Sequence, residues 1–185
     1  MIQAEMGSLH YKMIKTVLGE IAIIWESAPN FKLKRILLPN YCEKFNIQYP
    51  EITPLTSKVI DDLAEDISKF LAGEDKHFDI SILDFNSCSS FQGKVLRANY
   101  GIPRGRVSTY GRITKYIGNI GAARAVGRAL STNPFPIVIP CHRVIRTNGE
   151  LGGYGGGVEL KKRLLKMEGI WFTASGRILL DKVHY

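Results

Sequence analysis

The chain has 185 residues, with 25 Lys and Arg against 17 Asp and Glu, a net charge of +8, and 45% hydrophobic residues. This composition suits a globular protein of one or two domains and excludes a disordered chain. No apolar run is long enough to cross a bilayer, and residues 1–15 lack the charged-then-apolar order of a secretory signal. We therefore expect no membrane association and a cytoplasmic location, or a nuclear one in a eukaryote.

The positive charge is concentrated in the second half of the chain. Residues 1–90 hold 9 Lys and Arg against 13 Asp and Glu, a net charge of −4. Residues 91–168 hold 14 against 3, a net charge of +11. Such a concentrated excess is typical of a surface that binds a polyanion. We expect a nucleic-acid partner, bound in a salt-sensitive way with little sequence preference.

The first part of the chain predicts a small sheet. Apolar and polar residues nearly alternate over Tyr11–Trp25, which predicts two strands joined by a turn at Leu18–Glu20. The alternation returns over Phe31–Leu38 and predicts a third strand. Residues 39–54 contain three prolines and no sustained period, so we expect a loop there.

A helix and a further strand are expected before the chain changes character. Thr56 and Ser57 can cap a helix that ends at Gly73. Its apolar positions recur at helical spacing: Val59, Ile60, Leu63, Ile67, Phe70 and Leu71. Phe78–Phe85 is strand-like. The composition changes near Asn86–Ser90, and we place a boundary there between domains 1–88 and 89–185.

Three helices are predicted at the start of the second domain. The first is Phe91–Tyr100, and Ser108-Thr109 can cap the second, Tyr110–Ile117. The turn Gly118–Gly121 leads to the third, Ala122–Leu130. The last two form a candidate helix-turn-helix. The small residues of the third helix would let its backbone approach a DNA groove, but they would serve helix packing equally well.

The central feature of the second domain is Cys141, in the apolar, β-branched run Pro136–Ile145, which we expect to be a strand. A lone cysteine is most often a buried apolar filler. Here His142, Arg143 and the later Glu168 offer means of making a thiolate. They favour a reactive nucleophile over a filler.

The cysteines are three in number and widely spaced, which favours reduced thiols over a disulfide framework. A zinc site built from His10, Cys42, His77 and Cys88 stays open as an alternative, although no pair has ligand-like spacing. We predict no metal and no cofactor.

Turn signals follow the cysteine. Asn148-Gly149 predicts a hairpin, and Gly152–Gly157 is a loop whose bare amides either surround a planar ligand or serve as a linker. Val158–Met167 returns to helical period and carries four basic residues. Ile170–Tyr185 is expected to form a short hairpin or strand with a tail.

These motifs resemble those of the O6-alkylguanine-DNA alkyltransferases, also called methylated-DNA–protein-cysteine methyltransferases. The resemblance rests, in order, on Tyr110, Gly121–Gly127, Asn133-Pro134, Pro140–Val144 and Tyr154 to Gly169. It is dense over residues 91–169 and loose over residues 19–38. It implies an α/β (α+β) fold, with an N-terminal ribonuclease-H-like domain followed by a helix-turn-helix or winged-helix-like C-terminal domain.

The resemblance also implies a reaction and its residues. Cys141 would accept the alkyl group of O6-alkylguanine, and of O4-alkylthymine as a possible second substrate, in one irreversible turnover. His142 would act on Cys141 through a water, Glu168 would orient the imidazole, and Tyr110 would donate a proton to the guanine. The substrate-binding residues implied are Asn133, Val144, Tyr154, Gly155 and Gly156. The DNA-binding residues implied are Gln92, Asn119, Ala122, Ala123, Arg124, Gly127 and Thr147.

Two details of the resemblance bear on specificity. Arg124 resembles the arginine that fills the duplex when the target base is flipped out. Gly155 stands where many relatives have a serine, so only a backbone amide is available there. The expected partner is double-stranded DNA containing alkylated bases, bound by a monomer.

Three other functions stay open. Alkyltransferase-like proteins bind damaged DNA without reacting, but they commonly have tryptophan in place of the cysteine. A winged-helix transcription regulator would need neither Glu168 nor the glycine loop. A cysteine hydrolase would need an acyl-binding oxyanion site, and no motif supplies one.

Overall fold

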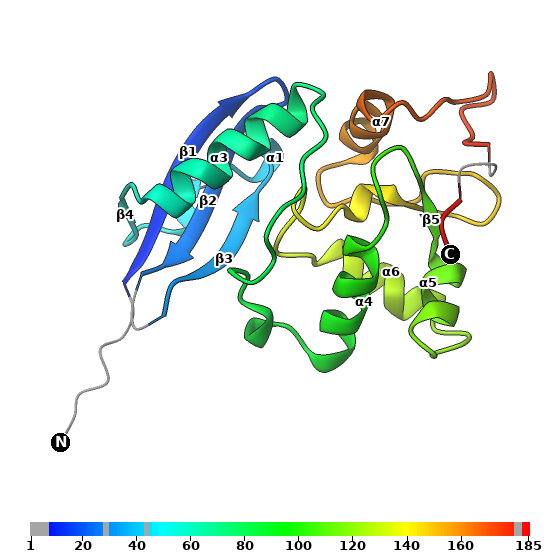
Figure 1. Ribbon diagram of the computed structural model, residues 1–185, viewed down its shortest axis with the longest axis horizontal. Coiled ribbons are helices and arrows are strands. Elements are labelled where there is room, and N and C mark those ends of the chain that lie inside the picture. Colours follow the sequence, from blue (N-terminus) through cyan, green and yellow to red (C-terminus); the bar gives the residue numbers. More distant parts are fainter. Residues whose placement is uncertain (1–7, 28–29, 43–44, 180–182) are drawn as a thin grey trace. The chain divides into compact units, whose positions relative to one another are not determined.

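The computed structural model describes residues 8–27, 30–42, 45–179 and 183–185 (Figure 1). The chain has a mixed α/β fold and divides into two compact units, Met1–Ser87 and Cys88–Tyr185. Within the described ranges no helix has both the length and the apolar character needed to cross a membrane.

The first unit is built on a four-stranded sheet. Its strands are β1 (Leu9–Thr16), β2 (Gly19–Glu26), β3 (Lys32–Leu37) and β4 (Thr53–Pro54). The order is β3-β2-β1-β4, with β1 and β4 parallel and the other pairs antiparallel. The predicted hairpin and third strand are confirmed.

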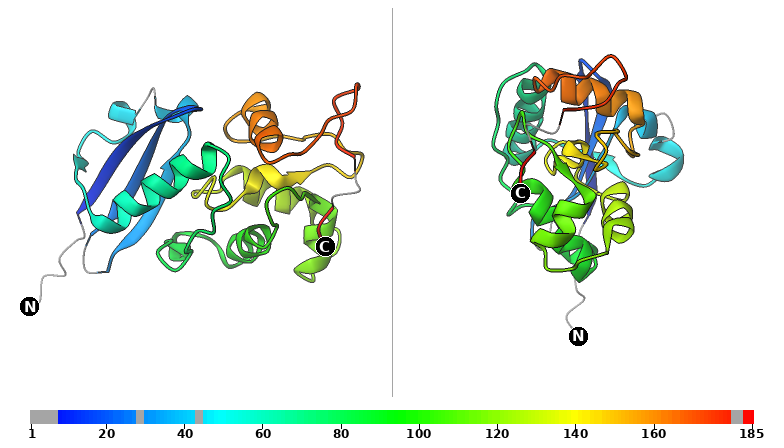
Figure 2. Two further views of the ribbon diagram at one scale, coloured as in Figure 1. Left: turned by 45° about the horizontal axis from the view of Figure 1, so that its top comes forward. Right: turned by 90° about the vertical axis from the view of Figure 1, so that its right-hand side faces the viewer.

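Helix α3 (Lys58–Leu71) packs across this sheet (Figures 1 and 2). It begins where predicted, because the Ser57 hydroxyl accepts a hydrogen bond from the Ile60 amide at 3.3 Å. The buried face of the helix consists of Ile60, Leu63, Ala64, Ile67, Phe70 and Leu71. Burial of this apolar stripe holds the helix on the sheet.

Residues 39–54 are not a plain loop. They contain two short helices, α1 (Pro39–Cys42) and α2 (Phe45–Gln48), as well as β4. The Phe45 side chain is buried, and its ring centroid lies 4.7 Å from that of Tyr11 on β1. Packing on the sheet stabilises single helical turns that are too short to produce a sequence period.

The prediction of a strand over Phe78–Phe85 is wrong. Only one isolated bridge forms, between Leu33 and Leu83, and residues Phe85–Ser87 form a short 3-10 helix, η1. The Asp79 carboxylate accepts hydrogen bonds from the amide and the hydroxyl of Ser81, both at 2.8 Å. This local turn competes with strand pairing.

The second unit begins with the three predicted helices, α4 (Ser90–Tyr100), α5 (Tyr110–Tyr116) and α6 (Ala123–Ser131). The first two are capped by the hydroxyls of Ser89 and Thr109. All three helices pack on one another. Their existence and order are confirmed.

The segment that carries Cys141 is not a strand. Cys141–Arg143 form a 3-10 turn, η2, and only Val144–Ile145 form a strand, β6, which pairs in parallel with β5 (Ser108–Thr109). The Cys141 amide bonds the Ile139 carbonyl at 2.8 Å. Because Pro136 and Pro140 have no amide hydrogen to give to a ladder, this apolar run turns instead of extending.

Helix α7 (Val158–Met167) lies on the other side of η2 from α5 and α6 (Figures 1 and 2). Asn148-Gly149 does form a turn, closed by a 2.8 Å bond from the Arg146 amide to the Glu150 carbonyl, but no second strand follows. Gly149 is required there, because it has φ of 80° and an added Cβ would lie 2.6 Å from a backbone oxygen. A short C-terminal hairpin is confirmed by the Phe172–Ile178 bridge.

Loss of the α3 cap is expected to weaken the first unit. Ser57→Ala should lower its free energy of unfolding by about 1 kcal/mol, because the Ile60 amide loses its acceptor. Urea denaturation followed by Trp25 fluorescence in a Trp171→Phe background reports on this unit alone. Ser57→Asp should restore most of the loss, and an unchanged midpoint in Ser57→Ala would contradict the capping role.

Candidate active site

Cys141 is the first residue of η2 and is 7% exposed. Asn133, just beyond the end of α6, donates from Nδ2 to the Cys141 sulfur at 3.2 Å and to the Ile139 carbonyl at 3.0 Å. Its Oδ1 accepts from the Phe135 amide at 2.9 Å, which fixes the orientation of the side chain. Asn133 therefore positions the thiol and ties the end of α6 to the cysteine turn.

His142, Arg143 and Glu168 form one buried cluster. His142 Nε2 lies 2.7 Å from Glu168 Oε1, and both side chains are fully buried. Arg143 grips the same carboxylate with two bonds, from Nε at 2.8 Å and from a terminal nitrogen at 2.9 Å. Its other terminal nitrogen donates to the Ile102 carbonyl at 2.6 Å. The carboxylate at the C-terminal end of α7 thus anchors two consecutive residues of η2.

The charges in this cluster follow from its hydrogen bonds. Burial by itself would raise the pKa of Glu168, but His142 and Arg143 outweigh it and lower that pKa to about 2. Burial lowers the pKa of His142 despite the neighbouring carboxylate. A neutral imidazole beside an ionised carboxylate carries its proton on Nε2, which leaves the lone pair on Nδ1.

Nδ1 of His142 is the candidate base. It is buried and has no hydrogen-bond partner among the described residues. An unpartnered buried nitrogen is costly unless function requires it. The atom is therefore available to accept a proton.

The thiol itself is not activated in advance. Burial raises the pKa of Cys141, and the Asn133 amide and Lys161 oppose this effect without overcoming it. Because the sulfur is buried, the thiol stays protonated until a base removes its proton.

Lys161 is a site residue that sequence reasoning missed. It is fully buried in α7, and its ammonium donates to the carbonyls of Val144 and Leu151, both at 2.6 Å, and of Gly153 at 3.4 Å. Burial lowers its pKa to about 8. The available signal was its spacing from Leu164 and Leu165, which places it on the apolar face of the helix.

Asn99 was also missed. This fully buried residue of α4 donates from Nδ2 to the Pro140 carbonyl at 3.2 Å, directly before the cysteine. Its signal was a polar side chain among the apolar positions Val95, Leu96 and Ala98.

Tyr110 lies between two glycines from different segments. A Cβ added at Gly127 on α6 would lie 3.7 Å from its ring, and one added at Gly152 would lie 2.9 Å from its hydroxyl. Burial, followed by the proximity of Cys141, raises the pKa of Tyr110, so the phenol keeps its proton. Gly127, which was predicted to bind DNA, thus also lies beside the Tyr110 ring.

The predicted wall of the substrate pocket is only partly assembled around the cysteine. The Tyr154 ring lies edge-on to His142, with centroids 6.5 Å apart, and Gly155 and Gly156 form the following turn. The Val144 carbonyl already accepts from Lys161, and the Cys141 carbonyl accepts from the Val144 amide. A carbonyl has a second lone pair, so both can still accept from a ligand.

The predicted DNA-binding residues fall into two groups. Asn119, Arg124 and Thr147 are exposed, whereas Gln92, Ala122, Ala123 and Gly127 are partly buried. The Gln92 amide nitrogen is already engaged by the carbonyls of Ala129 and Thr132 and by the Thr132 hydroxyl, at 3.0–3.2 Å. This side chain joins α4 to the end of α6.

No metal site accompanies the cluster. Among the described residues no group of three or more His, Cys, Asp or Glu side chains is arranged to hold an ion. The site is a buried cysteine nucleophile with a histidine–carboxylate pair, in a unit that carries a basic pair of helices. This is the arrangement expected of a nucleic-acid-binding protein whose cysteine reacts.

Comparisons with known proteins identify the family. The model for the DNA-binding domain of 6-O-methylguanine DNA methyltransferase matches residues 90–170. The methylated-DNA–protein-cysteine methyltransferase of Mycobacterium bovis is 36% identical over 160 residues, which is 86% of this chain and 92% of that protein. That of Methanothermobacter thermautotrophicus is 52% identical over 108 residues, which is 58% of this chain and 60% of the length of that protein.

Solved structures agree. The O6-methylguanine methyltransferase of Mycobacterium tuberculosis superimposes with a TM-score of 0.72 at 33% identity, covering 86% of this chain and 92% of that one. The OGT of the same organism in complex with DNA gives 0.68 at 34% identity, with the same coverage. The chain belongs to the methylated-DNA–protein-cysteine methyltransferase family, which repairs DNA by moving alkyl groups to a cysteine.

The buried carboxylate is expected to make folding stability depend on acid. Because the pKa of Glu168 is lowered from 4.5 to about 2, its contribution is present above about pH 4.5 and is lost as pH falls toward 2. Glu168→Gln should be less stable at neutral pH, because Arg143 loses its carboxylate, and should show a shallower loss between these values. Urea midpoints across pH measure both effects.

The control is Glu159→Gln, which removes an exposed carboxylate from the same helix. It should keep the acid dependence of the wild-type protein. An equally steep loss in Glu168→Gln would show that this carboxylate is not the titrating group.

Proposed function

We propose that this chain repairs DNA by transferring the alkyl group of O6-alkylguanine to the sulfur of Cys141, once per molecule. The observation that carries the proposal is the buried cluster around Glu168. It gives His142 a free lone pair in the residue next to a cysteine whose sulfur is held by Asn133. Membership of the family supports the same reaction.

The first step is removal of the thiol proton. The proton of Cys141 goes to Nδ1 of His142, through a bridging water, and Glu168 stabilises the imidazolium that forms. The Asn133 amide and the Lys161 ammonium then stabilise the sulfur anion. A thiolate made in a buried site is poorly solvated and reactive.

The second step is displacement at carbon. The sulfur bonds to the alkyl carbon while the bond from that carbon to O6 breaks, and the electron pair goes to the guanine. Tyr110 donates its proton to the ring of the departing base. Because burial raises its pKa, the phenol is protonated at neutral pH and has a proton to give. The thioether product has no leaving route, so the protein is consumed, and no cofactor takes part.

The guanine is proposed to bind against the Gly152–Gly157 loop. Tyr154 stacks on the base, the amides of Gly155 and Gly156 face O6, and the carbonyls of Cys141 and Val144 accept from the exocyclic amine. Lys161 supports this wall, because it bonds the carbonyls of Val144 and Leu151. With Gly155 in place of serine, only backbone donors reach O6; O4-alkylthymine is the alternative substrate.

The DNA duplex is proposed to bind as a partner of α5 and α6, with one protein monomer for each alkylated base. Arg124 is exposed in the first turn of α6 and enters the stack when the base flips out. The same turn and helix also carry Asn119, Ala122, Ala123 and Gly127. Thr147 lies near α5, because its Cγ2 would be 3.8 Å from a Cβ added at Gly111. Gln92 supports the end of α6.

We further propose that domains 1–88 and 89–185 are a ribonuclease-H-like domain and a helix-turn-helix or winged-helix-like domain. The sheet order β3-β2-β1-β4, with only β4 parallel to its neighbour, supports the first assignment. The helices α4 to α6 followed by the short β5–β6 pair support the second. The expected location is the cytoplasm, or the nucleus in a eukaryote.

The decisive experiment follows a label. DNA containing O6-methylguanine with a labelled methyl group should transfer the label to Cys141, stoichiometrically, and Cys141→Ala should abolish the transfer. Cys42→Ala and Cys88→Ala are matched controls and should keep it. Label that stays on the DNA, or that leaves as methanol, would overturn the proposal.

A second experiment separates base flipping from DNA affinity. Arg124→Ala should slow transfer from duplex DNA by ~10-fold or more while changing transfer from single-stranded DNA much less, since only a duplex requires the gap to be filled. Arg128→Ala, an exposed arginine of the same helix, should affect both substrates alike. Equal losses in Arg124→Ala on both substrates would reduce Arg124 to a phosphate contact.

A further inference from the structure

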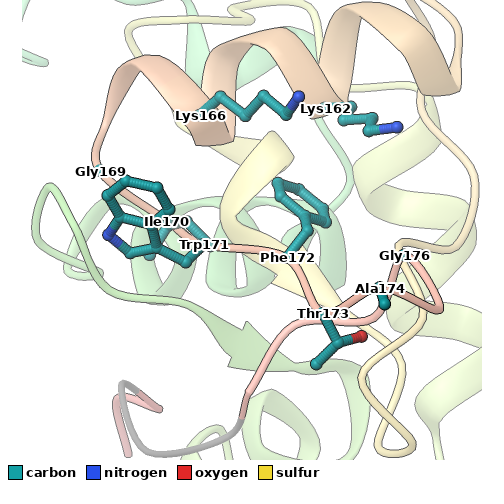
Figure 3. Close-up of a pocket in the computed structure, with 9 residues that line it drawn as sticks. All are labelled: Lys162, Lys166, Gly169, Ile170, Trp171, Phe172, Thr173, Ala174 and Gly176. Carbon is teal, nitrogen blue, oxygen red and sulfur yellow. The ribbon is translucent and has the colours of Figure 1, made fainter.

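A pocket outside the active site lies between the outer face of α7 and the C-terminal hairpin (Figure 3). It has a volume of ≈ 490 Å³ and is lined by Lys162 and Lys166 of α7 and by Trp171, Phe172 and Thr173 of the hairpin. Figure 3 shows the two lysines on the helix, the Phe172 ring below them, and the Trp171 ring beside Gly169 at the end of the helix. Among the described residues, none that lines the pocket is acidic.

The lysines of this pocket are available to an anion. They are four residues apart, so they lie on adjacent turns of one helix face. The Lys162 ammonium lies 6.0 Å from the centroid of the Phe172 ring. In the part of the chain that the structure describes, neither ammonium lies within ion-pair distance of a carboxylate.

The pocket also presents a large exposed ring. Trp171 is 79% exposed, whereas the other tryptophan of the chain, Trp25, is fully buried in the first unit. An exposed tryptophan beside cations is the combination that proteins use to bind single-stranded nucleic acid: bases stack on the ring while phosphates meet the lysines.

We propose that this pocket is a second nucleic-acid site, which takes a short single-stranded segment, with a base on Trp171 and phosphates on Lys162 and Lys166. The site goes beyond the proposed repair reaction. A single strand fits better than a duplex, because duplex bases are stacked on one another and present no free face. An acidic protein segment would satisfy the lysines but would leave the ring unused.

The position of the pocket supports a separate role. Helix α7 and the paired helices α5 and α6 lie on opposite sides of the turn that carries Cys141, in both views of the second unit (Figures 1 and 2). A duplex bound on α5 and α6 therefore leaves the pocket open. The protein can then hold a damaged duplex and a neighbouring single strand together.

The test uses the full chain and an oligothymidylate of about eight nucleotides, which contains no guanine. Because Trp25 is buried and Trp171 is exposed, saturable quenching of tryptophan fluorescence reports on the pocket. Quenching should disappear in Trp171→Phe. The double variant Lys162→Glu/Lys166→Glu should bind ~10-fold or more weakly, and its salt dependence should lose a slope of about 1.4, the value for two phosphate contacts.

The control for charge is Lys15→Glu/Lys58→Glu, which makes the same change in net charge at exposed lysines of the first unit. It should bind the oligothymidylate as the wild type does. Both double variants should transfer methyl groups from duplex DNA at the wild-type rate, so a failure of this site is distinct from a failure of the repair reaction.

Three results would overturn the proposal. One is quenching that is absent, or that is equal in the two double variants. Another is quenching that undamaged duplex displaces at saturation, which would place the single strand on α5 and α6. The third is quenching by polyglutamate but not by oligothymidylate, which would assign the pocket to an acidic protein segment.

Discussion

The second unit depends on one buried carboxylate. Glu168 receives His142 Nε2 on one oxygen and is gripped by Arg143 on both. A buried charge is tolerated only when it is paired and hydrogen-bonded, and here three donors from two adjacent residues bind the carboxylate. Glu168 lies at the end of α7, and its partners His142 and Arg143 directly follow Cys141. The bonds that stabilise the buried charge therefore also set the distance between α7 and the cysteine turn.

Around this anchor the cysteine turn is held from several directions by side chains that bond backbone carbonyls. Asn99 reaches the carbonyl of Pro140, Asn133 that of Ile139, and Lys161 that of Val144. A turn of irregular backbone would otherwise bury unsatisfied polar groups. The polar side chains replace the ladder that a true strand would have supplied, and they leave the Cys141 sulfur at a fixed place without a regular element beneath it.

The sequence was sufficient for the regular elements and for the reactive residues. Helices α3 to α7 have clear periods, and α3 to α5 also have side-chain caps. Cys141, His142 and Glu168 stand in a recognisable order. It was insufficient where tertiary context prevails. The β-branched run before Cys141 indicated a strand, but two prolines prevent its pairing. Lys161 stands in a basic run that looks exposed, and its burial depends on carbonyls that lie outside α7. The short helices α1 and α2 were missed because they are stabilised by packing on the sheet and are too short to show a period.

The buried, protonated state of Cys141 has a meaning for an acceptor that works once. Oxidants and other electrophiles react with exposed thiolates. A sulfur modified in this way can no longer accept an alkyl group from DNA. A thiol that burial keeps protonated is slow to react with such reagents. The desolvation that keeps the thiol protonated therefore also protects it from side reactions. The protein keeps its single reaction until an alkylated base enters the site.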